Sequence, residues 1–233
     1  MPKKLRRQIP VSRRGALQGL GALGVLAAGG STRALWAAPA ASSLAPAGAL
    51  SFRVTRKGDQ IGHQEIDFAR QGHRLSVRSR IDIKVTLLGI AVFVFRHQVQ
   101  EIWQADRLVE LISATDDDGT PHQVHALSAG ASLRIEADGH TSEAPGDVMP
   151  SSMWNPETVH RTMILDSIKG LIGAVAIADR GEETLTIRGA PVSAHHYAVT
   201  GAVVREIWYG PDLALCQFRS PGKDGSIVTF ERV

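Results

Sequence analysis

The amino-acid sequence predicts a mainly β protein, built as a single curved antiparallel sheet or an open half-barrel with one short helix. Apolar and polar residues alternate almost without interruption from Arg74 to Leu87, a period of two that is typical of a strand with one wet face. A second long strand pattern, Ile90 to Gln104, follows Gly89, so the two read as a hairpin. Turn signals recur at short spacing along the rest of the chain, which favours a β meander.

The other strands are expected in chain order, each bounded by Gly, Pro, Asp or other residues that favour turns. The predicted strands are Leu50–Arg56, Ile61–Arg70, Arg107–Thr115, Gln123–Ala129, Ser132–Ala137, Glu183–Arg188, Ser193–Thr200, Val203–Tyr209, Leu213–Phe218 and Ser226–Arg232. The clearest turn signals between them are Lys57-Gly58-Asp59, Asp138-Gly139 and Gly210-Pro211-Asp212.

A helix is expected only after residue 155. Asn155 is a favourable helix cap, Pro156 suits the first helical position and Glu157 places an acid in the first turn. These signals predict a short helix over residues 156–162. Residues 163–178 fit either two strands with a turn between them or the end of a longer helix, and the stretch from Asp166 to Gly170 favours the turn.

The first forty residues are predicted to be a cleaved export signal. Arg13 and Arg14 precede a short apolar run over residues 15–30, and Ala38-Pro39-Ala40 has the small-x-small pattern that a signal peptidase cleaves. The paired arginines indicate the twin-arginine route, so the expected partners are its translocase and a signal peptidase, and the expected location is the periplasm or the medium. The run is too short and too rich in glycine for a permanent membrane span.

After this signal, residues 41–49 are predicted to be a flexible spacer and residues 50–233 a single β-rich domain. Without the seven basic residues of positions 1–40, 19 of the 26 Lys and Arg remain against 23 Asp and Glu, a formal charge of −4. That charge argues against nucleic acid as a partner, because nucleic-acid binding needs a clustered basic face. The single cysteine, Cys216, excludes an internal disulfide.

The strand from Ile90 to Gln104 carries the first candidates for a binding site. Phe93, Phe95, His97, Glu101 and Trp103 share one face, so two ionisable groups lie on the same side as two phenylalanines. Either His97 and Glu101 form an inward pair that lines a cavity, or the strand leaves the core near residue 96 and both groups are half-buried. An inward ionisable group is costly unless it is paired or hydrated, which favours the second interpretation.

Three further residues complete the candidate ligand-binding set. Trp154 lies in the loop before the predicted helix, where it either covers a cavity mouth or plugs the core. Glu206 and Trp208 repeat the Glu-x-Trp spacing of Glu101 and Trp103, as a duplicated hairpin or as a pattern that a curved sheet uses twice.

We expect no catalytic residue, cofactor or metal site. The adjacent His195 and His196 point to opposite faces of a strand and do not easily share a metal. His122 and His125 have a spacing that suits ligands on a helix better than ligands on a strand.

Several stretches are distinctive when taken together: Phe52-Arg53-Val54, Gly58-Asp59-Gln60-Ile61-Gly62, Glu101-Ile102-Trp103, Ser152-Met153-Trp154-Asn155-Pro156, Asp166 to Gly170, Gly181-Glu182-Glu183 and Ile207-Trp208-Tyr209. This set resembles an uncharacterised family of exported bacterial β-rich proteins, known as a domain of unknown function. The layout is more distantly similar to the open half-barrels of the LolA/LolB lipoprotein carriers, which hold acyl chains in an apolar concavity. The resemblance implies a fold and carries over no catalytic residue.

The function expected first is non-enzymatic binding of an apolar or amphipathic envelope molecule, such as a lipid, in the concavity of the sheet. Long amphipathic strands with little helix to cover them must close on themselves or bury something else. The second expectation is an exported enzyme or cofactor carrier that gathers His97, Glu101, Glu206 or the His195-His196 pair. The third is a structural or assembly partner in the envelope that uses an exposed sheet edge.

Overall fold

The computed structural model describes residues 44–233. The predicted signal residues Arg13, Arg14, Ala38 and Ala40 lie outside this range. Within it, no helix has the length and apolar character needed to cross a membrane.

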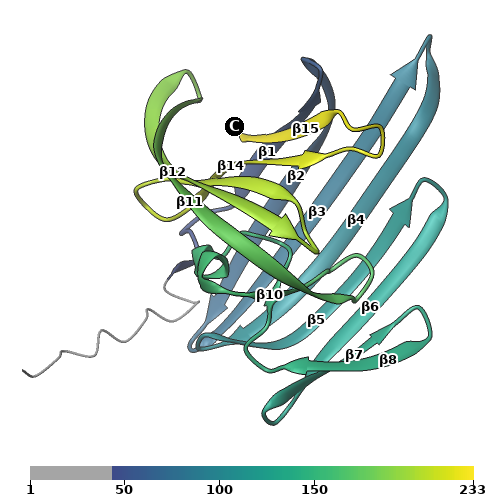
Figure 1. Ribbon diagram of the computed structural model, residues 1–233, viewed down its shortest axis with the longest axis vertical. Helices are drawn as coiled ribbons and strands as arrows, with labels where there is room; N and C mark the ends of the chain where they lie inside the picture. Colours follow the sequence, from purple (N-terminus) through teal and green to yellow (C-terminus); the bar gives the residue numbers. More distant parts are fainter. Residues whose placement is uncertain (1–43) are drawn as a thin grey trace, which may run out of the picture. The chain divides into compact units, whose positions relative to one another are not determined.

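The described chain forms one sheet of 15 strands with almost no helix, which confirms the predicted fold class (Figure 1). The strands are β1 (Leu50–Arg56), β2 (Asp59–Gln71), β3 (Arg74–Leu87), β4 (Ile90–Gln104), β5 (Arg107–Asp117), β6 (Thr120–Ala129), β7 (Ser132–Ala137), β8 (His140–Pro145), β9 (Met149–Pro150), β10 (Met163–Leu165), β11 (Ile172–Ile187), β12 (Ala190–Gly201), β13 (Arg205–Tyr209), β14 (Leu215–Pro221) and β15 (Ile227–Arg232).

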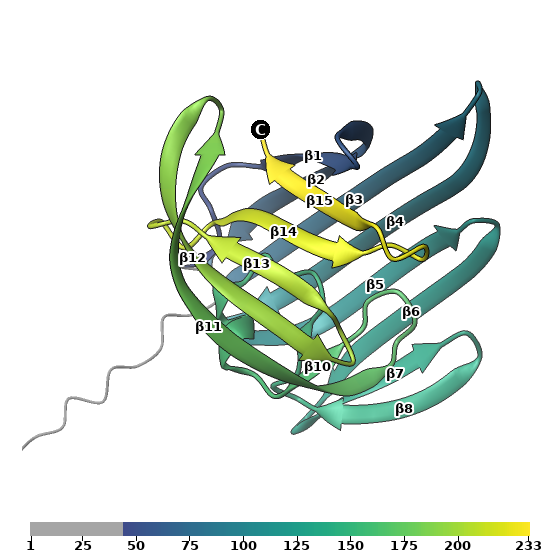
Figure 2. The same ribbon diagram turned by 45° about the horizontal axis from the view of Figure 1, so that its top comes forward.

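The sheet runs in the order β8-β7-β6-β5-β4-β3-β2-β1-β15-β14-β13-β12-β11-β10-β9. Neighbours are antiparallel except β9 and β10, which are parallel. The first and last strands pair, with Val54 opposite Phe230, so the two ends of the domain meet inside the sheet. Figures 1 and 2 show the ribbon curling round until β11 and β12 lie across from β4 and β5. The strand order leaves β8 and β9 as the two unpaired ends of an open barrel.

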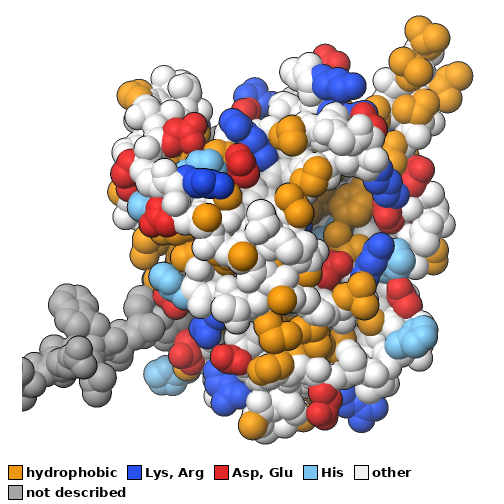
Figure 3. Space-filling view, in the orientation of Figure 1, with side chains coloured by type: hydrophobic (Ala, Val, Ile, Leu, Met, Phe, Trp, Pro, Cys, Tyr) orange, Lys and Arg blue, Asp and Glu red, His pale blue; other side chains and the backbone are white. Residues whose placement is uncertain are grey.

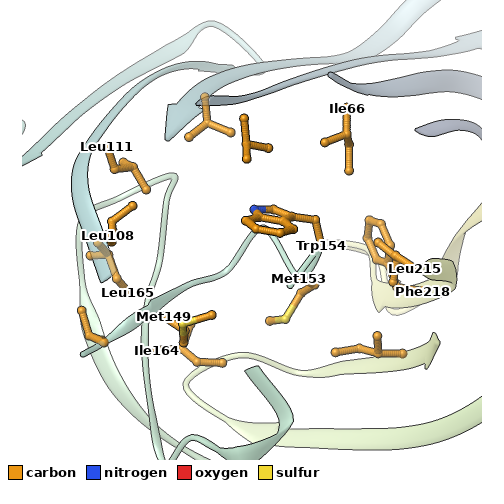
Figure 4. Packing of buried hydrophobic residues seen from close by; sticks show 14 of the residues in the cluster. Ile66, Leu108, Leu111, Met149, Met153, Trp154, Ile164, Leu165, Leu215 and Phe218 are labelled. Atoms are coloured by element: carbon orange, nitrogen blue, oxygen red, sulfur yellow. The ribbon is translucent and has the colours of Figure 1, made fainter. Parts of the chain in front are cut away.

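The segment from residue 146 to residue 171, here called the inner segment, packs inside the curled sheet. Met149, Met153, Trp154 and Leu165 are all almost completely buried. In Figure 4, Trp154 and Met153 lie between side chains from opposite walls, with Leu108 and Leu111 on the left and Leu215 and Phe218 on the right. The inner segment therefore fills part of the interior and joins the two walls in one hydrophobic core.

The inner segment confirms two sequence predictions and adjusts one. The predicted helix is a single 3-10 turn, η1 (Pro156–His160), and Asn155 caps it by accepting a hydrogen bond from the Glu157 N–H at 3.0 Å. Residues 163–178 contain the predicted turn, which is closed by the Gly170 N–H donating to the Asp166 carbonyl at 2.8 Å.

Other boundaries differ from the prediction. Strands β8 and β9 were not predicted. Strand β10 is the first strand of the favoured interpretation of residues 163–178, and β11 joins the second strand of that interpretation to the predicted strand Glu183–Arg188. A bulge between Asp179 and Gly181 exchanges the two faces of β11 and so breaks its alternation. Leu44 and Ala45, which we placed in a flexible spacer, are buried, and Arg70 hydrogen-bonds to the Ala45 carbonyl. These two residues therefore belong to the packed domain.

Candidate binding cavity

The part of the interior that the inner segment leaves open is a cavity of about 480 Å³. Its wall is mostly apolar and comes from both halves of the sheet. The apolar lining residues are Ile61, Ile81, Ile83, Val85, Val92, Phe93, Phe95, Val99, Ile168, Phe218, Val228 and Phe230. Its size and lining are those of a small-molecule site. Figure 3 shows a hollow with orange side chains beside the protruding β3–β4 hairpin.

Strand β4 places three of the predicted ligand-binding residues in this wall. Phe93, Phe95 and His97 alternate along the inner face and all line the cavity. The strand is more open at Phe93 and Phe95, and it is buried from His97 to Trp103. Our favoured interpretation, that His97 and Glu101 are half-buried where the strand leaves the core, was therefore wrong. The strand leaves the core at its phenylalanine end.

His97 lies at the inner end of the cavity with 4% of its surface exposed. Its Nδ1 lies 2.8 Å from Thr115 Oγ1, and its Nε2 lies 3.4 Å from Ser167 Oγ on the inner segment. Burial, with a smaller contribution from the positive charge of Arg205, lowers the pKa of His97 to about 4. The imidazole is therefore neutral at pH 7 and adds no charge to the cavity.

Glu101 is also inward and buried, but it does not line the cavity or pair with His97 within the described structure. Its Oε2 accepts hydrogen bonds from the indole N–H groups of Trp154 and Trp103, each at 2.8 Å. Burial raises the pKa of Glu101, although hydrogen bonds from Trp154, Ser152 and Trp103 oppose the shift. Glu101 thus joins β4 to the inner segment, and Trp154 plugs the core rather than covering the mouth.

The remaining two candidates lie on the opposite face of the sheet. Trp208 is buried in a small outer cluster with Leu185, Ala194 and Cys216, stacked on His196 at a ring-centroid distance of 4.2 Å. Its indole N–H donates to Glu183 at 2.7 Å. Glu206 is exposed on the same outer face, with its carboxylate 3.6 Å from His196. The repeated Glu-x-Trp spacing therefore faces inward on β4 and outward on β13.

His195 points away from His196, as the sequence predicted. Its ring nitrogens contact Asp179 at 2.6 Å and Glu182 at 2.9 Å beside the β11 bulge, and these hydrogen bonds raise the pKa of His195. Over residues 44–233, no group of three or more His, Cys, Asp or Glu side chains is arranged to hold a metal.

Sequence reasoning missed two polar residues at the inner end of the cavity, Arg205 and Gln64. Arg205 on β13 reaches in from the far wall, and its Nη1 donates to the Ser151 carbonyl at 2.6 Å. Gln64 on β2 is buried and donates from Nε2 to Ser79 Oγ at 2.9 Å. Arg205 shares a face with Ile207 and Tyr209, both buried, and this alternation was the available signal.

The mouth of the cavity lies under the loop between β14 and β15. Lys223 in this loop reaches across to the end of β5, where its Nζ lies 2.8 Å from Asp117 Oδ1. The same ammonium lies 5.3 Å from the centre of the Phe93 ring. Arg56 on β1 holds the loop from the other side, with its Nε donating to Ser226 Oγ at 2.7 Å. The loop, residues 222–226, therefore crosses the opening of the cavity and is held there mainly by polar side chains; it is here called the strap.

These features define an open β-barrel with a largely apolar interior cavity and a polar inner end. Residues 52–233 match the family described as a domain of unknown function (DUF6134), and the chain belongs to that family. A crystal structure of a beta-barrel-like protein of the domain of unknown function DUF1849 from Brucella abortus has a similar fold. The TM-score is 0.58 at 10% identity, over 79% of this chain and 94% of that one. A comparison with curated proteins gave no significant match.

Proposed function

We propose that the protein binds an apolar or amphipathic envelope molecule, such as a lipid, in the interior cavity of the open barrel. The observation that carries this proposal is the cavity itself, about 480 Å³ bounded by aliphatic and aromatic side chains from both walls. Burial of apolar ligand surface against such a wall supplies the main favourable free energy of binding.

The β3–β4 hairpin supports an apolar ligand. Val85 and Val92 belong to the cavity wall, and beyond them Leu87, Leu88 and Ile90 continue the apolar surface to the tip. These three side chains are 63%, 95% and 70% exposed, and orange side chains cover the tip in Figure 3. An exposed apolar surface of this kind is typical of a binding region. An apolar molecule can therefore remain in contact with aliphatic side chains as it enters.

The predicted leader supports a periplasmic place of action. We propose that the twin-arginine translocase exports the folded chain and that a signal peptidase removes residues 1–40.

The two other functions considered have less support. The enzyme hypothesis needs its ionisable groups in one cleft. His97 lies in the cavity, whereas Glu206 lies on the outer face of the sheet. An assembly partner would need an open sheet edge. Of the two edge strands, β9 is buried, and β8 is short and carries Glu143 and Pro145. Charge and proline on an edge strand disfavour the addition of another strand.

Binding can be measured with the neutral fluorescent probe N-phenyl-1-naphthylamine. Native mass spectrometry of the protein purified from a bacterial periplasm detects any copurified molecule. The wild type should enhance the probe's fluorescence and carry a copurified molecule. Ile81→Trp adds a large side chain to the cavity wall and should weaken probe binding at least about tenfold, because it removes the space that the probe fills.

Leu127→Trp is the matched control, because Leu127 lies exposed on the outside of β6. This variant should bind the probe like the wild type. A wild type that binds neither the probe nor a copurified molecule, or an Ile81→Trp variant that is folded and binds equally well, would rule out the cavity as the binding site.

A further inference from the structure

Arg205 is partly buried, and its guanidinium places a positive charge at the polar inner end of the largely apolar cavity. One of its N–H groups donates to the Ser151 carbonyl, and its Cζ lies 5.4 Å from the centre of the Phe218 ring. No Asp or Glu of residues 44–233 forms an ion pair with it within 4.0 Å. Guanidinium has five N–H donors in a planar fork that matches the geometry of a carboxylate or phosphate.

The other charged groups of the cavity are already paired. At the mouth, Lys223 pairs with Asp117 and Arg56 pairs with Asp224. His97 is neutral at pH 7, and Asp166 acts on Arg205 only as a more distant charge. Burial lowers the pKa of Arg205, but an arginine remains protonated in a folded protein. A partly buried charge without a counter-ion costs free energy, so an anionic ligand group beside Arg205 would lower that cost.

Gln64 provides an independent sign that a polar ligand group belongs at this end. The side chain is 3% exposed, lines the cavity and leaves its Oε1 without a hydrogen-bond partner among the described residues. Rotation of the terminal amide exchanges its oxygen and nitrogen, so Gln64 can present either an acceptor or an N–H donor to a ligand while it keeps its contact with Ser79. Ser152 and Ser167 line the same cavity.

We infer that the ligand is an amphiphile with an acidic head group, a carboxylate or a phosphate monoester, which binds Arg205 at the inner end while its apolar chain lies along the phenylalanine wall toward the mouth. This inference rests on the proposed function, because it assigns the head group of the same ligand. The positive charge of Arg205 provides the selectivity for an acidic head group. The net charge of the domain does not attract anions, because the formal charge after residue 40 is −4.

The experiment compares three amphiphiles with the same alkyl chain length: palmitate, hexadecyl phosphate and hexadecanol. Displacement of N-phenyl-1-naphthylamine from the wild-type protein reports each affinity. One or both acids should bind at least about tenfold more tightly than the alcohol, because a hydrogen bond to a charged group contributes more than one between neutral groups. The two acids distinguish a fatty acid from a phosphorylated lipid as the source of the head group.

Variants then assign the effect to Arg205. Arg205→Met should lose the preference for the acids, a fall of about ten- to hundredfold in their affinity, while hexadecanol binds as before. Arg205→Lys should retain part of the preference, because lysine keeps the charge without the planar fork. Arg53→Met is the control and should keep the full preference, because Arg53 is an exposed arginine that does not line the cavity.

The outcomes separate this inference from the function on which it rests. If the three amphiphiles bind the wild type equally, or if folded Arg205→Met keeps the preference, the acidic head group is wrong and the cavity remains a binding site. If neither the probe nor any amphiphile binds, the proposed function itself fails. Should Arg205→Met not fold, the wild-type comparison and Arg205→Lys decide between these outcomes.

Discussion

His97 couples the stability of the domain to pH. Its pKa of about 4 in the folded chain lies below the ordinary 6.5 expected after unfolding. The unfolded chain therefore binds this proton first as the pH falls, and the stability associated with neutral His97 is lost between pH 6.5 and about 4. The difference corresponds to at most about 3 kcal/mol.

We predict that His97→Gln weakens this dependence. In urea unfolding at a series of pH values from 7 to 4, the wild type should lose stability relative to the variant as the pH falls, because glutamine cannot take up the proton. His63→Gln, at an exposed position on β2, serves as the control and should follow the wild type. A constant difference between wild type and His97→Gln at all these pH values would contradict a buried neutral imidazole.

The same residues show what a period of two can establish. Alternation correctly placed Phe93, Phe95, His97, Glu101 and Trp103 on one face of β4. It did not show which end of the strand is buried, because the inner segment that covers His97 and Glu101 comes from a distant part of the chain. Nor could it show that Trp208 faces outward. A Glu-x-Trp spacing places its two residues on the same face of a strand but does not tell which face is the interior one.

Among the elements, the turn from Asp166 to Gly170 positions the inner segment against the wall. The Ile168 N–H donates to Asp166 Oδ1 at 2.9 Å, and Ser113 Oγ donates to the Ser167 carbonyl at 2.5 Å. Gly170 has a φ of +67°, and a Cβ added to it would lie 2.4 Å from the Cβ of Ala137 on β7. This position therefore needs glycine for its backbone conformation and for its close contact.

We predict that Gly170→Ala destabilises the domain by more than the about 1–2 kcal/mol that a left-handed conformation alone costs an L residue. Gly139→Ala separates the two effects, because Gly139 has a φ of +83° but has no atom within 4 Å of the added Cβ. Thermal or urea unfolding of both variants gives the comparison. Equal losses of stability would show that the contact with Ala137 relaxes at no cost.

Two departures from the predicted strands have separate physical causes. Strand β9 has two residues, too few for a period to be visible, and both are buried. Strand β11 has a bulge that changes the side on which apolar residues fall. The alternation of apolar and polar residues predicted long strands such as β3, because one face of such a strand is directed to the interior and the other to solvent.

For the whole molecule, the strap between β14 and β15 should control how fast a ligand enters and leaves. The side chains of Lys223 and Asp117 are 66% and 18% exposed, and an ion pair this accessible contributes about 0–1 kcal/mol to stability. The pair nevertheless connects the loop between β14 and β15 to β5, which is far from both strands in the sheet order, and both of its residues line the cavity. Its loss should therefore affect the opening far more than the fold.

We predict that Asp117→Asn leaves the unfolding midpoint nearly unchanged and increases the dissociation rate of N-phenyl-1-naphthylamine several-fold in stopped-flow measurements. Added salt should increase the wild-type rate in the same direction, because it screens an exposed pair. Glu231→Gln breaks a comparable exposed pair, with Arg53 at 3.1 Å between β1 and β15, but Glu231 does not line the cavity and the rate should not change. A dissociation rate that is the same in Asp117→Asn and the wild type would mean that ligand exchange does not depend on the strap.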